Sequence, residues 1–259
     1  MKPAALAFVL AALAAASSAD ALLARPDRDD EEYRELATRY PAAVRLPGAG
    51  ASGILVAPRW VLTAAAPVGP FAASPGKLAV EAGGRAYPVQ AIFRPDGPDP
   101  DVALVQLREP VDGIEPVRPW RRDDEAGTAV RVVGFGAAGP VGGRDIRDGK
   151  ARAGVNTIDR VEARHLGIRL KGTDDASDLQ GALADGDLGA PALVEVEGRA
   201  FVAGIAVARA QAATRGPTGG AGDWERYARV SILAAWIDAV TFRAAAEEAA
   251  AAVGGAESR

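Results

Sequence analysis

Side chains able to do acid–base or nucleophilic chemistry are few in this sequence. The 259 residues include one histidine, His165, and no cysteine, so thiol nucleophiles, disulfides and thiolate metal sites are excluded. Two aspartates lie beside distinctive segments of the sequence. Asp101 precedes the apolar run 102–107, and Asp187 lies in the glycine-flanked turn 186–189 (Gly-Asp-Leu-Gly). Activating a hydroxyl nucleophile needs a base beside it and a carboxylate that orients the base, and neither segment contains a histidine.

Two segments resemble the active-site motifs of the trypsin-like serine proteases of the chymotrypsin fold. Residues 57–66 (Ala-Pro-Arg-Trp-Val-Leu-Thr-Ala-Ala-Ala) are similar to the strand end that carries the general-base histidine, and Ala66 stands at the histidine position. Residues 186–191 (Gly-Asp-Leu-Gly-Ala-Pro) resemble the nucleophile motif Gly-Asp-Ser-Gly-Gly-Pro, with Leu188 at the serine position. An alanine cannot accept a proton and a leucine cannot attack a carbonyl. The resemblance therefore implies a protease site without its base and its nucleophile.

The third triad position keeps its residue type. Residues 99–107 (Asp-Pro-Asp-Val-Ala-Leu-Val-Gln-Leu) resemble the family's Asp-Ile-Ala-Leu-Leu strand, which gives Asp101 the place of the orienting carboxylate. Taken alone, Asp101 would be interpreted as a turn residue at a strand start. Its separation from Ala66 along the chain is close to the family's spacing. We therefore predict that Asp101 is the one triad member that remains.

The resemblance also implies positions for the oxyanion hole and the substrate cleft. The oxyanion-hole loop corresponds to Gly186, Asp187 and Leu188. Residues 204–209 resemble the Gly-Ile-Val-Ser-Trp-Gly strand that pairs with bound peptide, and the cleft positions on it are Val207, Ala208 and Arg209. Arg209 replaces a glycine at the pocket entrance, and Ala182 stands at the pocket floor. The pocket therefore has no evident acidic floor for a lysine or arginine side chain.

No other residue of the sequence takes over the missing roles. His165 lies after Asp101 in chain order, on or beside an expected strand, where a strand-edge or surface histidine is the simpler interpretation. Ser177 lies in a polar, negatively charged loop and is interpreted as an ordinary turn serine. One histidine and no cysteine leave no transition-metal cluster to propose. We predict neither a metal nor a cofactor.

These residues leave three functional interpretations, in order of preference. The first is a trypsin-like homologue without catalytic activity that binds a peptide or protein ligand, or regulates an active protease, through the old cleft. Arg209 filling the pocket would count against that use of the cleft. The second is a structural or envelope-interaction protein that docks through an Ala-rich C-terminal helix, residues 244–253. The third is a working serine-type endopeptidase, as family resemblance alone implies.

Short apolar segments separated by turn clusters are typical of a β-barrel or sandwich. The family resemblance implies an all-β fold of two six-stranded antiparallel barrels packed face to face, with a C-terminal helix. We expect the first barrel in residues 43–117, with strands at 43–46, 53–57, 60–64, 77–81, 85–93 and 102–107. After a linker at 118–126, we expect the second in residues 127–230, with strands at 129–135, 150–158, 164–170, 192–196, 199–208 and 227–230. Residues 231–259 combine helix-spaced apolar residues with an Ala-rich tail.

The N-terminus has the pattern of a secretory signal. A basic start is followed by an apolar stretch from Ala4 to Ala16 and by small residues that end at Ala19 or Ala21. That stretch is shorter than the ~20 apolar residues that a membrane span needs. We therefore expect residues 1–21 to be removed, the protein to be secreted or periplasmic, and no stable membrane anchor.

Residues 22–42 form a charged segment that we interpret as solvated surface. In the best-studied branch of the family, a cleaved apolar N-terminus inserts its ammonium group beside the aspartate that precedes the nucleophile. This chain has no Ile-Val-Gly-Gly sequence, which leaves that activation step without a sequence signal. The formal net charge of −4, from 30 basic and 34 acidic residues, gives no electrostatic support for nucleic acid as a partner. We expect a monomer.

Overall fold

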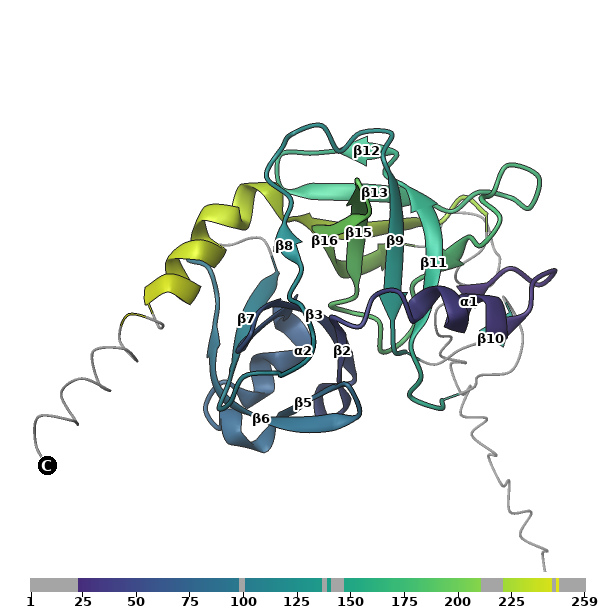
Figure 1. The fold of residues 1–259 in the computed structure, drawn as a ribbon. Helices are drawn as coiled ribbons and strands as arrows, with labels where there is room; N and C mark the ends of the chain where they lie inside the picture. Colours follow the sequence, from purple (N-terminus) through teal and green to yellow (C-terminus); the bar gives the residue numbers. More distant parts are fainter. Residues whose placement is uncertain are drawn as a thin grey trace, which may run out of the picture.

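The computed structural model describes residues 23–97, 101–136, 139–140, 147–210, 221–243 and 246. They form two β-sheet bodies with an N-terminal segment on one side and a C-terminal helix on the other (Figure 1). Residues 1–21, expected to be a signal peptide, lie outside the described residues, as does the Ala-rich tail apart from residue 246. Within the described part of the chain, no helix has the length and apolar character needed to cross a membrane.

The first body is a closed, antiparallel six-stranded barrel, as expected. Around the barrel the strands are β2 (Ala43–Leu46), β3 (Ala51–Ala57), β4 (Trp60–Ala64), β7 (Val102–Leu107), β6 (Arg85–Phe93) and β5 (Ala79–Ala82). Four of these strands have the predicted bounds, and β3 and β5 differ by two residues at their starts. Strand β7 is buried along its whole length, and its apolar residues belong to the hydrophobic cluster that the barrel shares with the second body.

The second body is an eight-stranded sheet that curves into a half-barrel. Along its main path the strands are β11 (Arg152–Thr157), β9 (Ala129–Gly134), β15 (Pro191–Val196), β16 (Arg199–Ala210), β17 (Trp224–Arg229), β13 (His165–Arg169) and β12 (Arg160–Val161), and β8 (Arg118–Pro119) pairs with β16. The fold class is therefore confirmed, with more strands in this sheet than the six expected. The additional strands β8 and β12 have two residues each, which is too short to leave a periodic signal in the sequence.

Short helical turns and the C-terminal helix complete the fold. Helix α2 (Ala65–Val68) follows β4, and 3-10 turns occur at η1 (Pro47–Ala49), η2 (Gly69–Phe71), η3 (Pro75–Lys77) and η4 (Ser231–Leu233). Residues 234–243 continue from η4 as an α-helix, in the region where helical spacing predicted one. Leu233 and Ile237 are buried in the same cluster as the barrel core, so this helix is anchored to both bodies.

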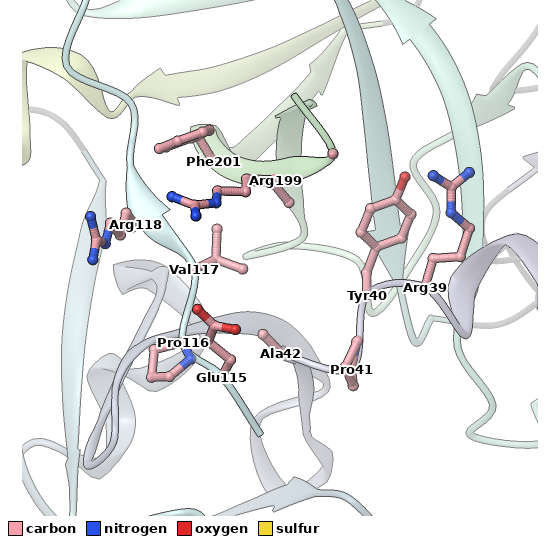
Figure 2. Close-up of a pocket in the computed structure, with 12 residues that line it drawn as sticks. Arg39, Tyr40, Pro41, Ala42, Glu115, Pro116, Val117, Arg118, Arg199 and Phe201 are labelled. Atoms are coloured by element: carbon pink, nitrogen blue, oxygen red, sulfur yellow. The ribbon is translucent and has the colours of Figure 1, made fainter. Parts of the chain in front are cut away.

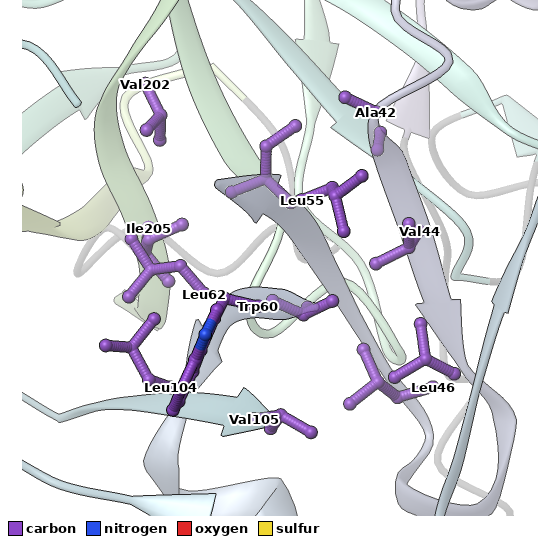
Figure 3. Packing of buried hydrophobic residues seen from close by; sticks show 14 of the residues in the cluster. Ala42, Val44, Leu46, Leu55, Trp60, Leu62, Leu104, Val105, Val202 and Ile205 are labelled. Atoms are coloured by element: carbon purple, nitrogen blue, oxygen red, sulfur yellow. The ribbon is translucent and has the colours of Figure 1, made fainter. Parts of the chain in front are cut away.

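One hydrophobic cluster joins the barrel to the second sheet. It contains Leu62 and Leu104 from the barrel together with Val202 and Ile205 from β16, and Figure 3 shows these side chains around a common space. All four are fully buried. Because apolar area removed from water stabilises a fold by ~25 cal/mol per Å², the contact between the two bodies is part of the protein's core.

The N-terminal segment is docked as well as charged: its strand belongs to a separate three-stranded sheet, and its helix packs against β11 of the second sheet. Strand β1 (Leu23–Ala24) pairs with β10 (Gly139–Pro140) and β14 (Gly181–Ala182), and helix α1 (Asp30–Ala37) follows. The charges of α1 are mostly exposed, but Tyr33 is fully buried and its hydroxyl donates to the Gln180 carbonyl oxygen at 3.0 Å. The sequence could not show this, because the partners lie more than a hundred residues away.

Arg152 forms the ionic part of that docking. Its side chain is 3% exposed and donates two hydrogen bonds to the carboxylate of Asp30, at 2.5 and 2.7 Å. It also donates to Asp148, which lowers the pKa of that carboxyl group to about 2. A buried arginine needs such partners to offset its loss of hydration.

We expect Arg152→Gln to lower the free energy of unfolding by about 2 kcal/mol, because it removes charge-assisted hydrogen bonds at a buried position. Urea unfolding and limited proteolysis of residues 25–42 would measure the effect. The control is the exposed Arg164→Gln, with a change within about 0.5 kcal/mol. Equal stability of the two variants would show that Arg152 does not hold the N-terminal segment.

Candidate functional site

The positions predicted for the general base and the orienting carboxylate lie next to each other. Ala66 is in α2, directly after β4, and Ala64 at the end of β4 pairs with Val102 of β7. The backbone N–H of Ala65 donates to the carbonyl oxygen of Asp101 at 3.1 Å. The antiparallel pairing of β4 with β7 thus brings Ala66 and Asp101 together from distant parts of the sequence.

The loop that carries Leu188 packs directly against the same part of the barrel. The backbone N–H of Ser52, in β3, donates to the Leu188 carbonyl oxygen at 2.9 Å. Gly189 has φ +89°, and a Cβ placed there would lie 2.0 Å from the Ser52 carbonyl oxygen and 2.2 Å from Thr63 Oγ1. Only glycine fits such a contact. The position predicted for the nucleophile therefore lies beside the end of β4.

Of the three side chains brought together, only Asp101 can ionise. Ala66 is exposed and Leu188 is half-buried. The Asp101 side chain is 33% exposed and lies 4.0 Å from the guanidinium of Arg94. At the three predicted triad positions, the side chains of Ala66 and Leu188 thus offer Asp101 neither a base nor a hydroxyl.

The two residues considered as substitutes lie elsewhere. His165 begins β13 in the second sheet, where it pairs with Ala228 of β17, whereas Asp101 precedes a strand of the barrel. The hydroxyl of Ser177 donates to the carbonyl oxygen of Val155, which occupies it in a structural role. Neither is brought to the candidate triad.

The pocket implied by the family resemblance is crossed by Arg209. Ala182 is buried in β14 at the predicted floor. From β16, the guanidinium of Arg209 donates to the carbonyl oxygen of Leu183, the residue after Ala182, and pairs with Asp185 at 3.3 Å. The arginine thus bridges the two chain segments that would form the pocket walls.

Glu225 completes this network from the neighbouring strand. It lies opposite Arg209 in the pairing of β16 with β17 and is 1% exposed. Its carboxylate accepts hydrogen bonds from the Leu183 N–H and from the Tyr227 hydroxyl, the latter at 2.8 Å. Arg209 and Glu225 are therefore both bonded to Leu183, next to the predicted pocket floor.

The other cleft positions lie on an irregular part of β16. The register between β16 and β17 shifts between Ala206 and Ala208, which leaves Val207 as the extra residue. Val207 is half-buried and packs against the cluster that joins the two bodies, and Ala208 is also half-buried. The family's strand has a tryptophan and a glycine where this chain has Ala208 and Arg209. The side chains that this strand offers to a peptide therefore differ from those of the family.

A family model for the trypsin-like peptidase domain matches residues 51–205. The match begins at β3, ends in β16, and contains Ala66, Asp101 and Leu188. The chain belongs to the trypsin-like peptidase family. A search of curated proteins gave no match.

Within this trypsin-like domain, the loop before Leu188 is held by a buried carboxylate. Asp187 is fully buried and accepts hydrogen bonds from the N–H groups of Gly136 at 2.8 Å and Ala184 at 3.0 Å. Burial raises its pKa to about 6, and the two N–H groups act in the opposite direction. The predicted oxyanion-hole loop is thus shaped by main-chain contacts to Asp187, with Gly186 at φ +92°.

Two residues important to this site were missed by the sequence analysis. Ser52 is fully buried, and its hydroxyl accepts from the Phe135 N–H at 3.1 Å and lies 3.3 Å from the Gly186 carbonyl oxygen. Glu225 was missed because the strand was expected to start at Tyr227. The alternation of Glu225 with Tyr227 could have indicated a shared inward face.

The described residues contain no group of three or more His, Cys, Asp or Glu side chains arranged to hold a metal ion. The hollow beside the sole histidine has a volume of about 250 Å³ and is lined by His165, Arg209, Trp224 and Glu225, among others. Arg160 stacks on the Trp224 ring at 4.6 Å. These residues offer cationic and aromatic surface but no metal-binding arrangement.

We expect the stability of this domain to fall as pH rises from 4.5 to about 7, because burial raises the pKa of Glu225 to about 7 from an ordinary value of 4.5. In this window the folded state still holds a proton that the unfolded chain has released, so the unfolded state is favoured by rising pH. The expected loss is about 2–3 kcal/mol. Glu225→Gln should reduce the slope, as measured by urea unfolding between pH 4.5 and 8, and should leave the part that comes from Asp187, whose pKa is raised to about 6.

The matched control for that measurement is Glu162→Gln, which changes an exposed glutamate and should leave the slope unchanged. The same slope in Glu225→Gln and in the unaltered protein would show that Glu225 does not titrate in this window.

Proposed function

We propose that this trypsin-like domain is non-catalytic and acts by binding. The observation that supports the proposal is the residue types at the predicted triad positions: Ala65, next to Ala66, bonds to Asp101, Leu188 bonds to Ser52 of the same barrel, and neither an alanine nor a leucine side chain can transfer a proton or attack a carbonyl. Loss of a catalytic triad costs roughly 10⁶ in turnover, and the residual 10³–10⁴ over water depends on an intact oxyanion hole and intact substrate binding.

The network across the predicted pocket supports the same conclusion. A substrate side chain would have to displace Arg209 from Leu183 and Asp185 and meet the buried Glu225. Leaving a charged group without its partners costs several kcal/mol. We therefore infer that a partner does not use this pocket, which argues against the cleft-binding form of the first interpretation and leaves binding through another surface.

The purified protein should not cleave a mixed peptide library detectably by mass spectrometry. Ala66→His with Leu188→Ser should restore labelling by a fluorophosphonate probe, because the contacts of Ala65 with Asp101 and of Gly189 with the barrel position both sites. Peptide cleavage should remain slow in that double variant until Arg209→Gly opens the pocket. The matched control is the same set of changes combined with Asp101→Ala.

The competing interpretation, a working endopeptidase, makes the opposite prediction. Cleavage of the library by the unaltered protein, abolished by Asp101→Ala, would establish it and overturn the proposal of a non-catalytic domain.

We also propose that the protein is exported. The signal-like pattern ends at Ala19 or Ala21, and β1 begins at Leu23, so cleavage at either point leaves the described N-terminal contacts intact. Each of these contacts then belongs to the mature chain.

N-terminal sequencing of the exported protein should give Asp20 or Leu22 as the first residue. Ala19→Arg together with Ala21→Arg should block processing, because both exits of the signal lose their small residue. A cellular protein that keeps Met1 and is absent from the exported fraction would contradict export.

A further inference from the structure

A groove of about 490 Å³ lies away from the candidate triad, where three parts of the chain meet. One wall is the N-terminal segment at Arg39 and Tyr40, and the other is the connection between the two bodies, including Arg118. The floor is the hairpin between β15 and β16, with Arg199 and Phe201 (Figure 2). It shares no lining residue with the network around Arg209 and Glu225.

The walls of this groove are held at a set spacing by the barrel. The backbone N–H of Leu55 donates to the Ala42 carbonyl oxygen at 2.8 Å, and the Leu55 carbonyl oxygen accepts from the Val117 N–H at 2.8 Å. Tyr40 is fixed by its hydroxyl, which donates to Glu195 at 3.0 Å. A preformed surface of this kind loses little conformational entropy on binding.

The charge of the groove is opposite to that of the whole chain. Three arginines and one glutamate line it, in a protein of net charge −4. Arg39 pairs with Glu195 at 3.1 Å. Arg118 and Arg199 are exposed, and neither side chain has an ion-pair or hydrogen-bond partner within the described part of the chain. The groove therefore presents two cations that are available to a ligand.

Those two arginines have a spacing that an extended peptide can match. Arg199 and Phe201 are two residues apart in β16 and so lie on the same face, and Arg118 of β8 is the register partner of Phe201. Neighbouring strands are ~4.8 Å apart and alternate residues of a strand ~6.6 Å apart. Arg118 and Arg199 are therefore offset by one strand and two residues, which places their backbone positions ~8 Å apart on the diagonal. Acidic side chains at alternate positions of an extended peptide are ~6.6 Å apart, and the long arginine side chains can span the difference, so two such acidic side chains can reach both arginines.

We propose that this groove binds an extended segment of a partner protein with acidic residues at alternate positions. The two carboxylates pair with Arg118 and Arg199, and the peptide lies across the half-buried ring of Phe201, which is itself packed against Trp120 at 5.8 Å. Guanidinium groups bind carboxylates through paired, charge-assisted hydrogen bonds. This inference rests on the proposed binding function and names the surface and the class of partner.

Fluorescence anisotropy with a labelled peptide of alternating Glu and Thr tests the inference on the full mature protein. We expect binding that weakens about tenfold in Arg118→Ala with Arg199→Ala, because both charge pairs are lost, and that weakens as salt is raised. Arg164→Ala, which removes one exposed charge elsewhere, should leave binding unchanged. The matched peptide of alternating Gln and Thr should not bind detectably, and a peptide with its glutamates in one block should bind more weakly.

Equal binding by the double variant and the unaltered protein would overturn the inference. So would an oligonucleotide that binds through Arg118 and Arg199 when the peptide does not, because the groove would then serve nucleic acid. The proposal that the domain is non-catalytic has its own test: cleavage of the peptide library by the unaltered protein would overturn it. That result does not depend on the groove variants.

Discussion

The close packing of the loop 184–190 against the barrel is the constraint on which the candidate site depends. A side chain at Gly189 would collide with the Ser52 carbonyl oxygen, and one at Gly186 would lie 3.0 Å from the Cα of Gly136. The first requirement comes from the contact between the two bodies and the second from packing within the second body, and neither comes from chemistry on a substrate. The glycines that make the motif recognisable would therefore be needed even with a leucine between them.

Asp187 and Arg209 show how the same region can be stable without catalysis. The buried carboxylate of Asp187 is satisfied by two main-chain N–H groups, so its place in the loop does not depend on a substrate or a nucleophile. Arg209 and Glu225 both bond to the main chain of Leu183 beside the predicted pocket. The charges that would otherwise make this pocket a binding site are instead part of the protein's own hydrogen-bond network.

Local pattern predicted most of the fold, and distant contacts account for what it missed. Strands such as β4 and β7 were predicted with their bounds because they are apolar runs bounded by turn residues. The docking of α1 depends on Arg152 and Gln180, whose positions no local pattern reveals. At the site, the motifs identified the segments that meet, and the roles of Ala66, Asp101 and Leu188 stay predictions. The roles of Glu225 and Ser52 could be assigned only from the structure, because their hydrogen-bond partners lie on other segments of the chain.

The hydrophobic cluster shared by Leu62, Leu104, Val202 and Ile205 has a consequence for how the protein comes apart. Barrel and half-barrel bury the same apolar surface, and Leu233 and Ile237 of the C-terminal region close it from a third side. Separating the bodies would expose that surface to water at once. We therefore expect the two halves of this chain to melt together in one cooperative transition.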